Sequence, residues 1–279
     1  MKIYKQPRRA IIENEGKYYE LPVADWDAFI NRDNLYASVK SELPSAKSVS
    51  DEVLKQGVQV PMGSQEIWAA GVTYQRSKEA RMEEAKDSGG HVFYDKVYDA
   101  DRPELFFKAT AQRTVGDGDV VYIRRDSNWN VPEPELTLFI NSKGSIQGYT
   151  IGNDMSSRDI EGENPLYLPQ AKVYERCAAM GPCLYLQEDP LSPETVISIE
   201  ISRNGTYMFK EEVAIKMMKR SHTELVGYLF RECDFPTGVF LMTGTCLVPS
   251  DDFTLLEGDE VRISIDSIGT LINRVAKSK

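Results

Sequence analysis

Histidine and paired cysteines are scarce in this sequence, which excludes several kinds of metal site. Only His91 and His222 occur among 279 residues, so a zinc site with three histidine ligands cannot form. The four cysteines include no CxxC pair and therefore lack the spacing of zinc ligands. They stand in apolar stretches, as expected of free thiols in a reducing compartment. Any metal in this protein is thus expected to have oxygen ligands.

Several familiar sequence signals are also absent. There is no Gly-rich phosphate loop, no GxSxG nucleophile motif and no GxGxxG fingerprint. No apolar run approaches the ~20 residues that a membrane span needs. The segment Met1–Arg9 has no apolar stretch that could serve as a signal peptide. We therefore expect a cytoplasmic protein without a membrane partner.

Positive charge is outweighed by negative charge. The chain has 33 Lys and Arg against 43 Asp and Glu, a formal net charge of -10. A nucleic-acid partner is not expected, because binding to phosphates needs a basic surface. The basic runs Arg124–Arg125 and Lys216–Arg220 are short and are typical of solvated faces. A small acidic substrate remains possible if a metal ion supplies local positive charge.

The first 62 residues are predicted to form a small unit of their own. Arg9–Leu21 has the pattern of a β-hairpin, and Asp25–Leu43 has apolar positions at helical spacing. A turn at Pro61–Gly63 ends this unit. We therefore predict a small N-terminal domain over 1–62 and a catalytic domain over 63–279.

Short strands dominate the rest of the chain. A charged helix is predicted over Gln75–Lys86, and Ser221-His-Thr-Glu224 is a capping box that begins a second helix. Strands and helices do not alternate regularly, so we predict an α+β body and no doubly wound parallel sheet. The predicted strands are 67–72, 105–109, 120–124, 136–141, 146–151, 183–187, 196–202, 206–210, 240–244, 259–266 and 270–275.

A pair of glutamates marks the first candidate site. Glu133 and Glu135 are two residues apart in an extended segment, so their carboxylates project to the same face. Pro132 and Pro134 hold that segment extended. Two carboxylates on one face repel each other unless water solvates them or a cation bridges them. The alternative to a metal site is a solvated strand edge.

A third carboxylate favours the metal site. Strand 146–151 can pair with strand 136–141 through the turn at Ser142–Gly144, which would return Asp154 towards Glu133 and Glu135. Three converging carboxylates suit Mg²⁺, Mn²⁺ or Ca²⁺. The alternative role for Asp154 is to cap a helix over residues 156–159.

Three further residues could transfer protons. Glu104 precedes a strand, Lys172 lies among weakly polar residues, and His91 could titrate near neutral pH. A partly buried lysine beside a metal could take or give a proton. The alternative for Glu104 and Lys172 is an ordinary surface charge, and for His91 a place in a loop. His222, in the first turn of a helix, is expected to be structural.

Over residues 66–276 the chain resembles the fumarylacetoacetate hydrolase family. No single motif is specific, but their order and spacing together are. The matching stretches are Gly71–Tyr74, Pro103–Lys108, Pro132–Leu136, Gly148–Asp159, Gly181–Pro182, Thr243–Thr245, Leu256–Asp259 and Ile268–Asn273.

This resemblance implies a mixed β-sandwich roll, a homodimer and a Mg²⁺ ion held by Glu133, Glu135 and Asp154. It also implies that Lys172 is the active-site lysine. The pattern is most similar to the branch of 2-keto-3-deoxy-D-arabinonate dehydratases, which act in oxidative pentose breakdown. Matches to that branch imply a proton-transfer role for Glu104 and a place near the substrate for Thr270. Further substrate contacts are expected from polar side chains of the shared motifs: Thr73, Lys108, Arg158 and Thr245.

One departure from the family weakens the case for hydrolysis. Family members that hydrolyse carbon–carbon bonds carry a water-activating histidine soon after the Gly-x-x-Tyr motif, where this chain reads Thr73–Lys78. We therefore expect a dehydratase that converts a 2-keto-3-deoxy sugar acid into 2,5-dioxopentanoate. The alternatives are an acylpyruvate or fumarylpyruvate hydrolase, a 2-oxo acid decarboxylase or an isomerase on the same scaffold, and a non-catalytic binding protein.

Overall fold

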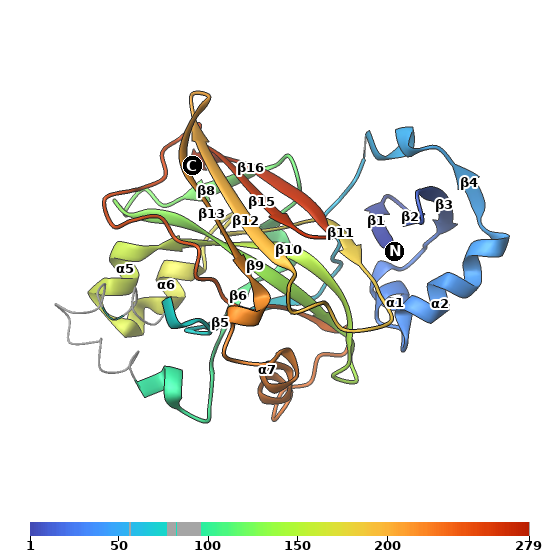
Figure 1. Cartoon of the computed structure of the whole chain (residues 1–279), viewed down its shortest axis with the longest axis horizontal. Helices are drawn as coiled ribbons and strands as arrows, with labels where there is room; N and C mark the ends of the chain where they lie inside the picture. The colour runs from blue at the N-terminus through green and yellow to red at the C-terminus, as the bar shows by residue number, and fades with distance from the viewer. Residues whose placement is uncertain (56, 77–81, 83–95, 279) are drawn as a thin grey trace.

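The computed structural model describes residues 1–55, 57–76, 82 and 96–278. Within these ranges the chain forms two β-sheets and a few short helices (Figure 1). Most of the predicted helix over Gln75–Lys86, and also His91, lie outside the described residues.

The larger sheet is mixed and has eleven strands in the order β4-β3-β2-β1-β11-β10-β9-β14-β5-β6, with β7 paired to β11. Its strands are β1 (Lys2–Gln6), β2 (Arg9–Asn14), β3 (Lys17–Pro22), β4 (Lys47–Val49), β5 (Glu66–Gly71), β6 (Glu104–Ala109), β7 (Thr114–Val115), β9 (Asn130–Ile140), β10 (Ile146–Ser157), β11 (Ala178–Tyr185) and β14 (Val239–Met242).

The smaller sheet has five strands in the order β13-β12-β15-β16-β8. Its strands are β8 (Val120–Ile123), β12 (Val196–Arg203), β13 (Thr206–Ala214), β15 (Glu260–Ile265) and β16 (Gly269–Lys277). The turn between β12 and β13 falls at Asn204 and Gly205, as the Asn-Gly pair favours.

The helices with described bounds are all short. They are α1 (Trp26–Ile30), α2 (Leu35–Glu42), α5 (Arg158–Glu163), α6 (Leu168–Lys172) and α7 (His222–Leu229), with 3₁₀ turns at Leu43–Ser45, Asp51–Lys55, Ala111–Arg113, Pro165–Tyr167 and Ile215–Met217. The predicted capping box is confirmed at α7, because the Glu224 backbone N–H donates to Ser221 Oγ at 3.1 Å. None of the helices in these ranges combines the length and hydropathy that crossing a bilayer demands.

The helical character predicted over Asp25–Leu43 is confirmed, but it is divided between two helices. Helices α1 and α2 are separated at Asn34, which has a φ of 45° in the left-handed region. The Asn34 side chain accepts the Ala37 backbone N–H and so begins α2. Asn tolerates this conformation and caps helices well, so its local geometry overrides the apolar spacing.

The core consists of two layers on the two faces of the larger sheet. From β9, Leu136, Leu138 and Ile140 pack towards the smaller sheet, in the same cluster as Ile199 and Ile263. The alternate residue Phe139 belongs to the other cluster, which includes Trp26, Ile30, Leu35 and Val39 of the N-terminal helices. This alternation follows from the two-residue period of a strand. It places Glu133 and Glu135 on the Phe139 face.

Both strands that carry the candidate carboxylates are longer than predicted. Strand β9 begins at Asn130 and not at Leu136, and β10 continues to Ser157, so Asp154 lies inside the strand. The prolines are tolerated because β14 pairs only with residues 137–140 of β9 and leaves one side of Pro132 and Pro134 without a strand partner. The predicted hairpin between these strands is confirmed.

The N-terminal strands extend the larger sheet. Strand β1 pairs with β11, so β1–β4 continue the sheet that carries the site (blue in Figure 1). The side chain of Asn31 also donates to Ser142 Oγ and to the Pro236 carbonyl in the body. Whether 1–62 and 63–279 behave as separate domains stays a prediction.

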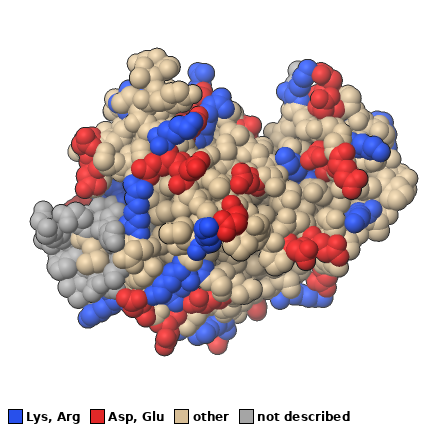
Figure 2. All heavy atoms as spheres, in the orientation of Figure 1, with Lys and Arg blue, Asp and Glu red and all other residues tan. Residues whose placement is uncertain are grey.

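On the face shown in Figure 2, acidic and basic side chains are interspersed.

The larger sheet curls into a roll around the candidate site. Strand β6 is separated from β10 by β9, β14 and β5 in the hydrogen-bonded order. Nevertheless Lys108 Nζ, on β6, donates to the Met155 carbonyl of β10 at 2.9 Å. The curvature therefore brings residues from distant strands to one place.

Candidate active site

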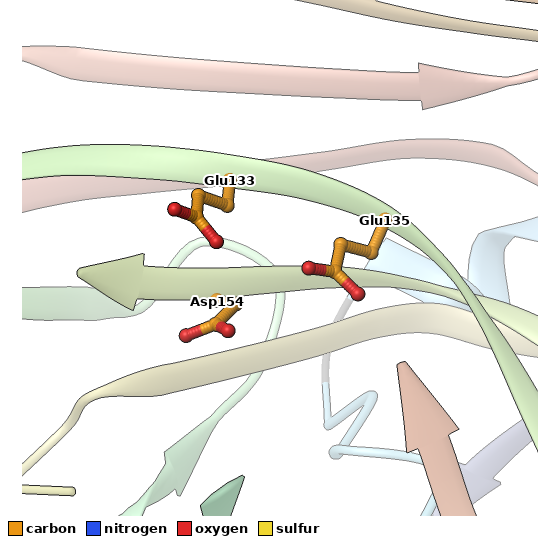
Figure 3. Close-up of side chains that lie close together, drawn as sticks. All are labelled: Glu133, Glu135 and Asp154. Carbon is orange, nitrogen blue, oxygen red and sulfur yellow. The ribbon is translucent and has the colours of Figure 1, made fainter. Parts of the chain in front are cut away.

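Three carboxylates meet where β9 and β10 pair. Glu133 lies directly opposite Asp154 in the antiparallel register, and Glu135 is two residues along β9 on the same face. One oxygen from each carboxylate lies within 4.8 Å of the others. Figure 3 shows the three side chains pointing towards a shared space. The convergence predicted for these residues is therefore present.

These carboxylates are buried, so the alternative of a solvated strand edge is wrong. The exposed fractions are 3% for Glu133, 1% for Glu135 and 0% for Asp154. The capping role for Asp154 is also wrong, because α5 begins after Ser157. Buried like charges are costly without compensating cations.

The pKa of Glu135 reflects the cost of burying this carboxylate beside two others. Its burial, and then the negative charges of Asp154 and Glu133, raise the pKa of its carboxyl well above the ordinary value of 4.5. The backbone N–H of Gly244 opposes this by donating to Glu135 Oε2 at 2.5 Å. A bound cation would relieve the same repulsion.

Asp154 lies between two lysines. Lys108 Nζ forms an ion pair with Asp154 Oδ1 at 2.5 Å, and Lys172 Nζ approaches Asp154 Oδ2 at 3.2 Å. Burial by itself would raise the pKa of Asp154, but the two ammonium groups lower it below its ordinary value. Asp154 is therefore held in the ionised form that ligates a metal.

Lys172 is completely buried and connects the acidic residues, so its alternative as a surface charge is wrong. Its ammonium donates to Glu133 Oε2 at 2.7 Å and to Ser156 Oγ at 2.6 Å. The ring of Phe106 lies 5.7 Å from Nζ. Helix α6 supplies Lys172 as its last residue.

Glu104 is half-buried beside the same cavity. A Cβ added to Gly71 would come within 2.0 Å of Glu104 Oε2, so the carboxyl lies against that glycine. The next residue, Val72, has a φ of 52°, which a β-branched side chain rarely adopts. Gly71 and Val72 line the cavity, so a strained backbone forms part of its wall, and the Glu104 carboxyl from β6 lies against Gly71.

A small cavity adjoins the carboxylates. Its described lining residues are Ala70, Gly71, Val72, Phe106, Glu133, Glu135, Asp154, Arg158, Gly244 and Thr245. Arg158 is 3% exposed and donates from Nη2 to Glu133 Oε1 at 2.8 Å. The buried Thr73 donates from Oγ1 to the Thr243 carbonyl next to this lining. Of the five residues predicted to bind substrate, Arg158 and Thr245 therefore line the cavity.

Two other residues predicted to bind substrate, Lys108 and Thr270, do not line the cavity. Thr270 is on β16 of the smaller sheet and shares a hydrogen bond with Ser264 at 2.8 Å. It is not among the described residues that line the cavity, and neither is Lys108, which lies behind them. His91 lies outside the described residues, so its position relative to the site stays a prediction.

Two functional groups were missed from the sequence. Ser156 accepts from Lys172, and the Gly244 N–H binds Glu135. Ser156 follows Asp154 by two residues and shares its face of β10, the same spacing that identified Glu133 and Glu135. That signal was available for Ser156. No comparable signal exists for a backbone N–H.

Comparison with known proteins identifies the class. Residues 66–276 match the family model described as the C-terminal region of fumarylacetoacetate (FAA) hydrolase. The chain belongs to the fumarylacetoacetate hydrolase family, as its motifs predicted.

Two curated relatives are similar to this chain over most of its length. The chain is 46% identical to a probable 2-keto-3-deoxyxylonate dehydratase of Haloferax volcanii, over 96% of this chain and 95% of the relative. It is 43% identical to the 2-dehydro-3-deoxy-D-arabinonate dehydratase of Saccharolobus solfataricus, over 78% of this chain and 74% of that protein.

A solved structure of 2-keto-3-deoxy-D-arabinonate dehydratase complexed with magnesium and 2,5-dioxopentanoate superposes with a TM-score of 0.86 at 35% identity, and the match covers 100% of both chains. The predicted fold class, a mixed β-sandwich roll, is confirmed.

The residues present fit a hard divalent cation. All three candidate ligands supply carboxylate oxygens, which Mg²⁺, Mn²⁺ and Ca²⁺ prefer. Lys108, Lys172 and Arg158 form ion pairs with Glu133 and Asp154, and Glu135 has the raised pKa that a cation would reverse. Glu133, Glu135 and Asp154 could therefore hold such an ion.

Proposed function

We propose that this protein is a Mg²⁺-dependent dehydratase that converts a 2-keto-3-deoxy pentonate into 2,5-dioxopentanoate. The observation that carries the proposal is the buried lysine that donates to two of three converging carboxylates, next to a cavity with an arginine in its wall. The names of the two relatives and the magnesium complex of the similar structure support this assignment.

Glu133, Glu135 and Asp154 would hold the metal. When bound, the ion supplies positive charge that orients the carboxylate and keto oxygens of a 2-oxo acid and stabilises the negative charge that develops on the keto oxygen. Arg158, which already reaches the cavity, would bind the substrate carboxylate. Thr73 and Thr245 are proposed to contact the substrate, and Thr270 stays a prediction.

Glu104 and Lys172 would divide the proton transfers. One group takes a proton from the third carbon, and the other gives a proton to the hydroxyl that leaves the fourth carbon as water. Tautomerisation of the resulting unsaturated alcohol then gives the aldehyde of 2,5-dioxopentanoate. Substrate and product therefore differ by one water, and no oxidant or reductant is required.

We also propose that the protein is a cytoplasmic homodimer. The four cysteines are free thiols in the structure, as expected in a reducing compartment. Light scattering coupled to size exclusion would test the dimer. A mass of twice 31.5 kDa is expected, and a mass of 31.5 kDa would contradict it.

Turnover of two substrates separates this proposal from its alternatives. Purified protein with Mg²⁺ is incubated with 2-keto-3-deoxy-D-arabinonate and, separately, with an acylpyruvate, and products are identified by NMR. Formation of 2,5-dioxopentanoate that stops on addition of EDTA is expected. Release of pyruvate from the acylpyruvate, with no change in the sugar acid, would instead establish a hydrolase. No turnover of any 2-oxo acid would favour a non-catalytic binding protein.

A further inference from the structure

Lys108 has no exposed surface, and acceptors surround its ammonium. Lys108 Nζ lies 2.5 Å from Asp154 Oδ1, 2.9 Å from the Met155 carbonyl and 2.5 Å from the Lys172 carbonyl. The ammonium donates hydrogen bonds to the Met155 and Lys172 carbonyls and forms an ion pair with the Asp154 carboxylate. Lys108 therefore contacts Asp154 and the backbone of β10 and α6, and it is not among the described residues that line the cavity.

The surroundings of Lys108 also separate it from the cavity. Phe106, two residues earlier on β6, lines the cavity, whereas Lys108 is not among its described lining residues. The ring of Tyr174 lies 5.8 Å from Lys108 Nζ. A substrate in the cavity would therefore contact Phe106 and not Lys108.

The contact with the Lys172 carbonyl has a structural consequence. Helix α6 has five residues and ends at Lys172. Such a short helix is marginal by itself, and its last carbonyls have no partner within the helix. The Lys108 ammonium supplies that partner and also complements the negative end of the helix dipole. The Lys108 side chain on β6 therefore fixes the position of the Lys172 backbone.

We propose that Lys108 is a positioning residue that holds Lys172 and Asp154 in their working geometry and does not contact the substrate. By holding the Lys172 carbonyl, Lys108 sets the distances from Lys172 Nζ to Glu133 Oε2 and Ser156 Oγ. Through Asp154 Oδ1 it fixes the carboxylate so that Oδ2 faces Lys172 Nζ, at 3.2 Å. This inference replaces the substrate-binding role predicted for Lys108, and its kinetic consequences rest on the proposed dehydratase function.

Kinetics of two variants distinguish positioning from substrate contact. Lys108→Met removes the charge and all donors, whereas Lys108→Gln keeps an N–H donor for the carbonyls and is expected to fold even if the Met variant does not. We expect kcat to fall about 10–100-fold, because small displacements of a catalytic group are costly, while KM changes less than about 3-fold. A KM raised about 10-fold with unchanged kcat would overturn the proposal, as would wild-type kinetics.

Lys143→Met is the matched control, because Lys143 is a largely exposed lysine that pairs with Asp33 and lies in the turn of the β9–β10 hairpin, at the end opposite Glu133 and Asp154. It is expected to leave kcat and KM at wild-type values. If Lys143→Met lowered kcat as much as Lys108→Met, the loss would not be specific to the buried lysine and the proposal would fail.

Two measurements do not depend on turnover. Pyruvate is a 2-oxo acid with no fourth carbon from which hydroxide can leave, and its affinity in the presence of Mg²⁺ is measured by calorimetry. We expect Lys108→Gln to bind pyruvate within about 3-fold of the wild type, and a crystal structure of this variant to show Lys172 Nζ displaced from Glu133. A 10-fold loss of pyruvate affinity, or an undisplaced Lys172, would contradict the proposal. If wild-type protein dehydrates no sugar acid, the proposed function fails, and these two measurements still decide the role of Lys108.

Discussion

Glu133 and Asp154 lie directly opposite each other across β9 and β10, and Lys172 Nζ donates to both carboxylates, at 2.7 and 3.2 Å. A cross-strand pair of like charges is unfavourable by itself. The lysine and a bound cation together can neutralise it. Two of the candidate metal ligands therefore also hold Lys172, one of the two proposed proton-transfer groups, beside the metal site.

Neutralising Glu135 should separate metal binding from stability. Glu135→Gln is expected to weaken Mg²⁺ binding at least about 100-fold, since it removes a ligand, which costs more than loss of a residue that only supports one. It should also raise the free energy of unfolding of the metal-free protein near neutral pH, because wild-type Glu135 must take up a proton or bury its charge on folding and Gln does neither.

Calorimetric titration and thermal unfolding without metal measure the two effects of Glu135→Gln. The control is Glu194→Gln, an exposed residue paired with Lys216. A metal-free Glu135→Gln protein that is less stable than the wild type would show that the ionised carboxylate stabilises the fold.

Removing the Lys172 ammonium should lower kcat more than it weakens substrate binding. Lys172→Met is expected to lower kcat by about 10²–10⁴-fold, the usual contribution of one general acid or base. Steady-state kinetics with the sugar acid measure this. An equal fall in activity for Lys172→Arg is expected, because the guanidinium does not exchange protons near neutral pH. Turnover retained in Lys172→Met would remove this residue from the mechanism.

The raised pKa of Glu135 predicts that Mg²⁺ binding depends on pH. A protonated carboxyl does not ligate the metal, and Glu135 keeps its proton to a pH well above 4.5. Affinity should therefore fall as the pH is lowered towards and through the raised pKa, and binding should release protons. Asp154 contributes nothing to this slope above its lowered pKa. Calorimetry in buffers of different ionisation enthalpy measures the protons released. Affinity that does not change between pH 5 and 8 would contradict the repulsion inferred at Glu135.

Gly71→Ala tests the placement of Glu104. The added Cβ would lie 2.0 Å from Glu104 Oε2, so this flexible carboxyl must move while the fold remains. We expect kcat to fall at least about 10-fold, because a misplaced acid or base loses most of its effect. Gly227→Ala on α7 is the control, because its Cβ would meet nothing within 4 Å. Equal activity in both variants would show that the position of Glu104 is unimportant.

The carboxylate site could be predicted from local spacing. Glu133 and Glu135 follow from the two-residue period, and the hairpin that returns Asp154 follows from one turn between two apolar strands. The starting point of β9 was missed because Pro132 and Pro134 oppose a central strand, and only the length of β14 explains why they are tolerated. The break at Asn34 was missed because its left-handed backbone is a local choice that apolar spacing does not record.

Contacts that depend on the curvature of the sheet could not be predicted from spacing. Lys108 reaches Asp154 only because the sheet rolls between β10 and β6. The family resemblance suggested the role of Lys172. Only the structure shows that Lys172 is completely buried. Resemblance also suggested Thr270, which the structure places in the smaller sheet and not in the lining of the cavity.

Anomalous diffraction from crystals soaked in Mn²⁺ tests the central claim most directly. One peak is expected between Glu133, Glu135 and Asp154, within about 2.0–2.3 Å of a carboxylate oxygen from each. The peak should vanish in Glu135→Gln crystals and persist in Glu194→Gln crystals. Wild-type crystals with no peak there, or with the three carboxylates turned away from one another, would contradict the account.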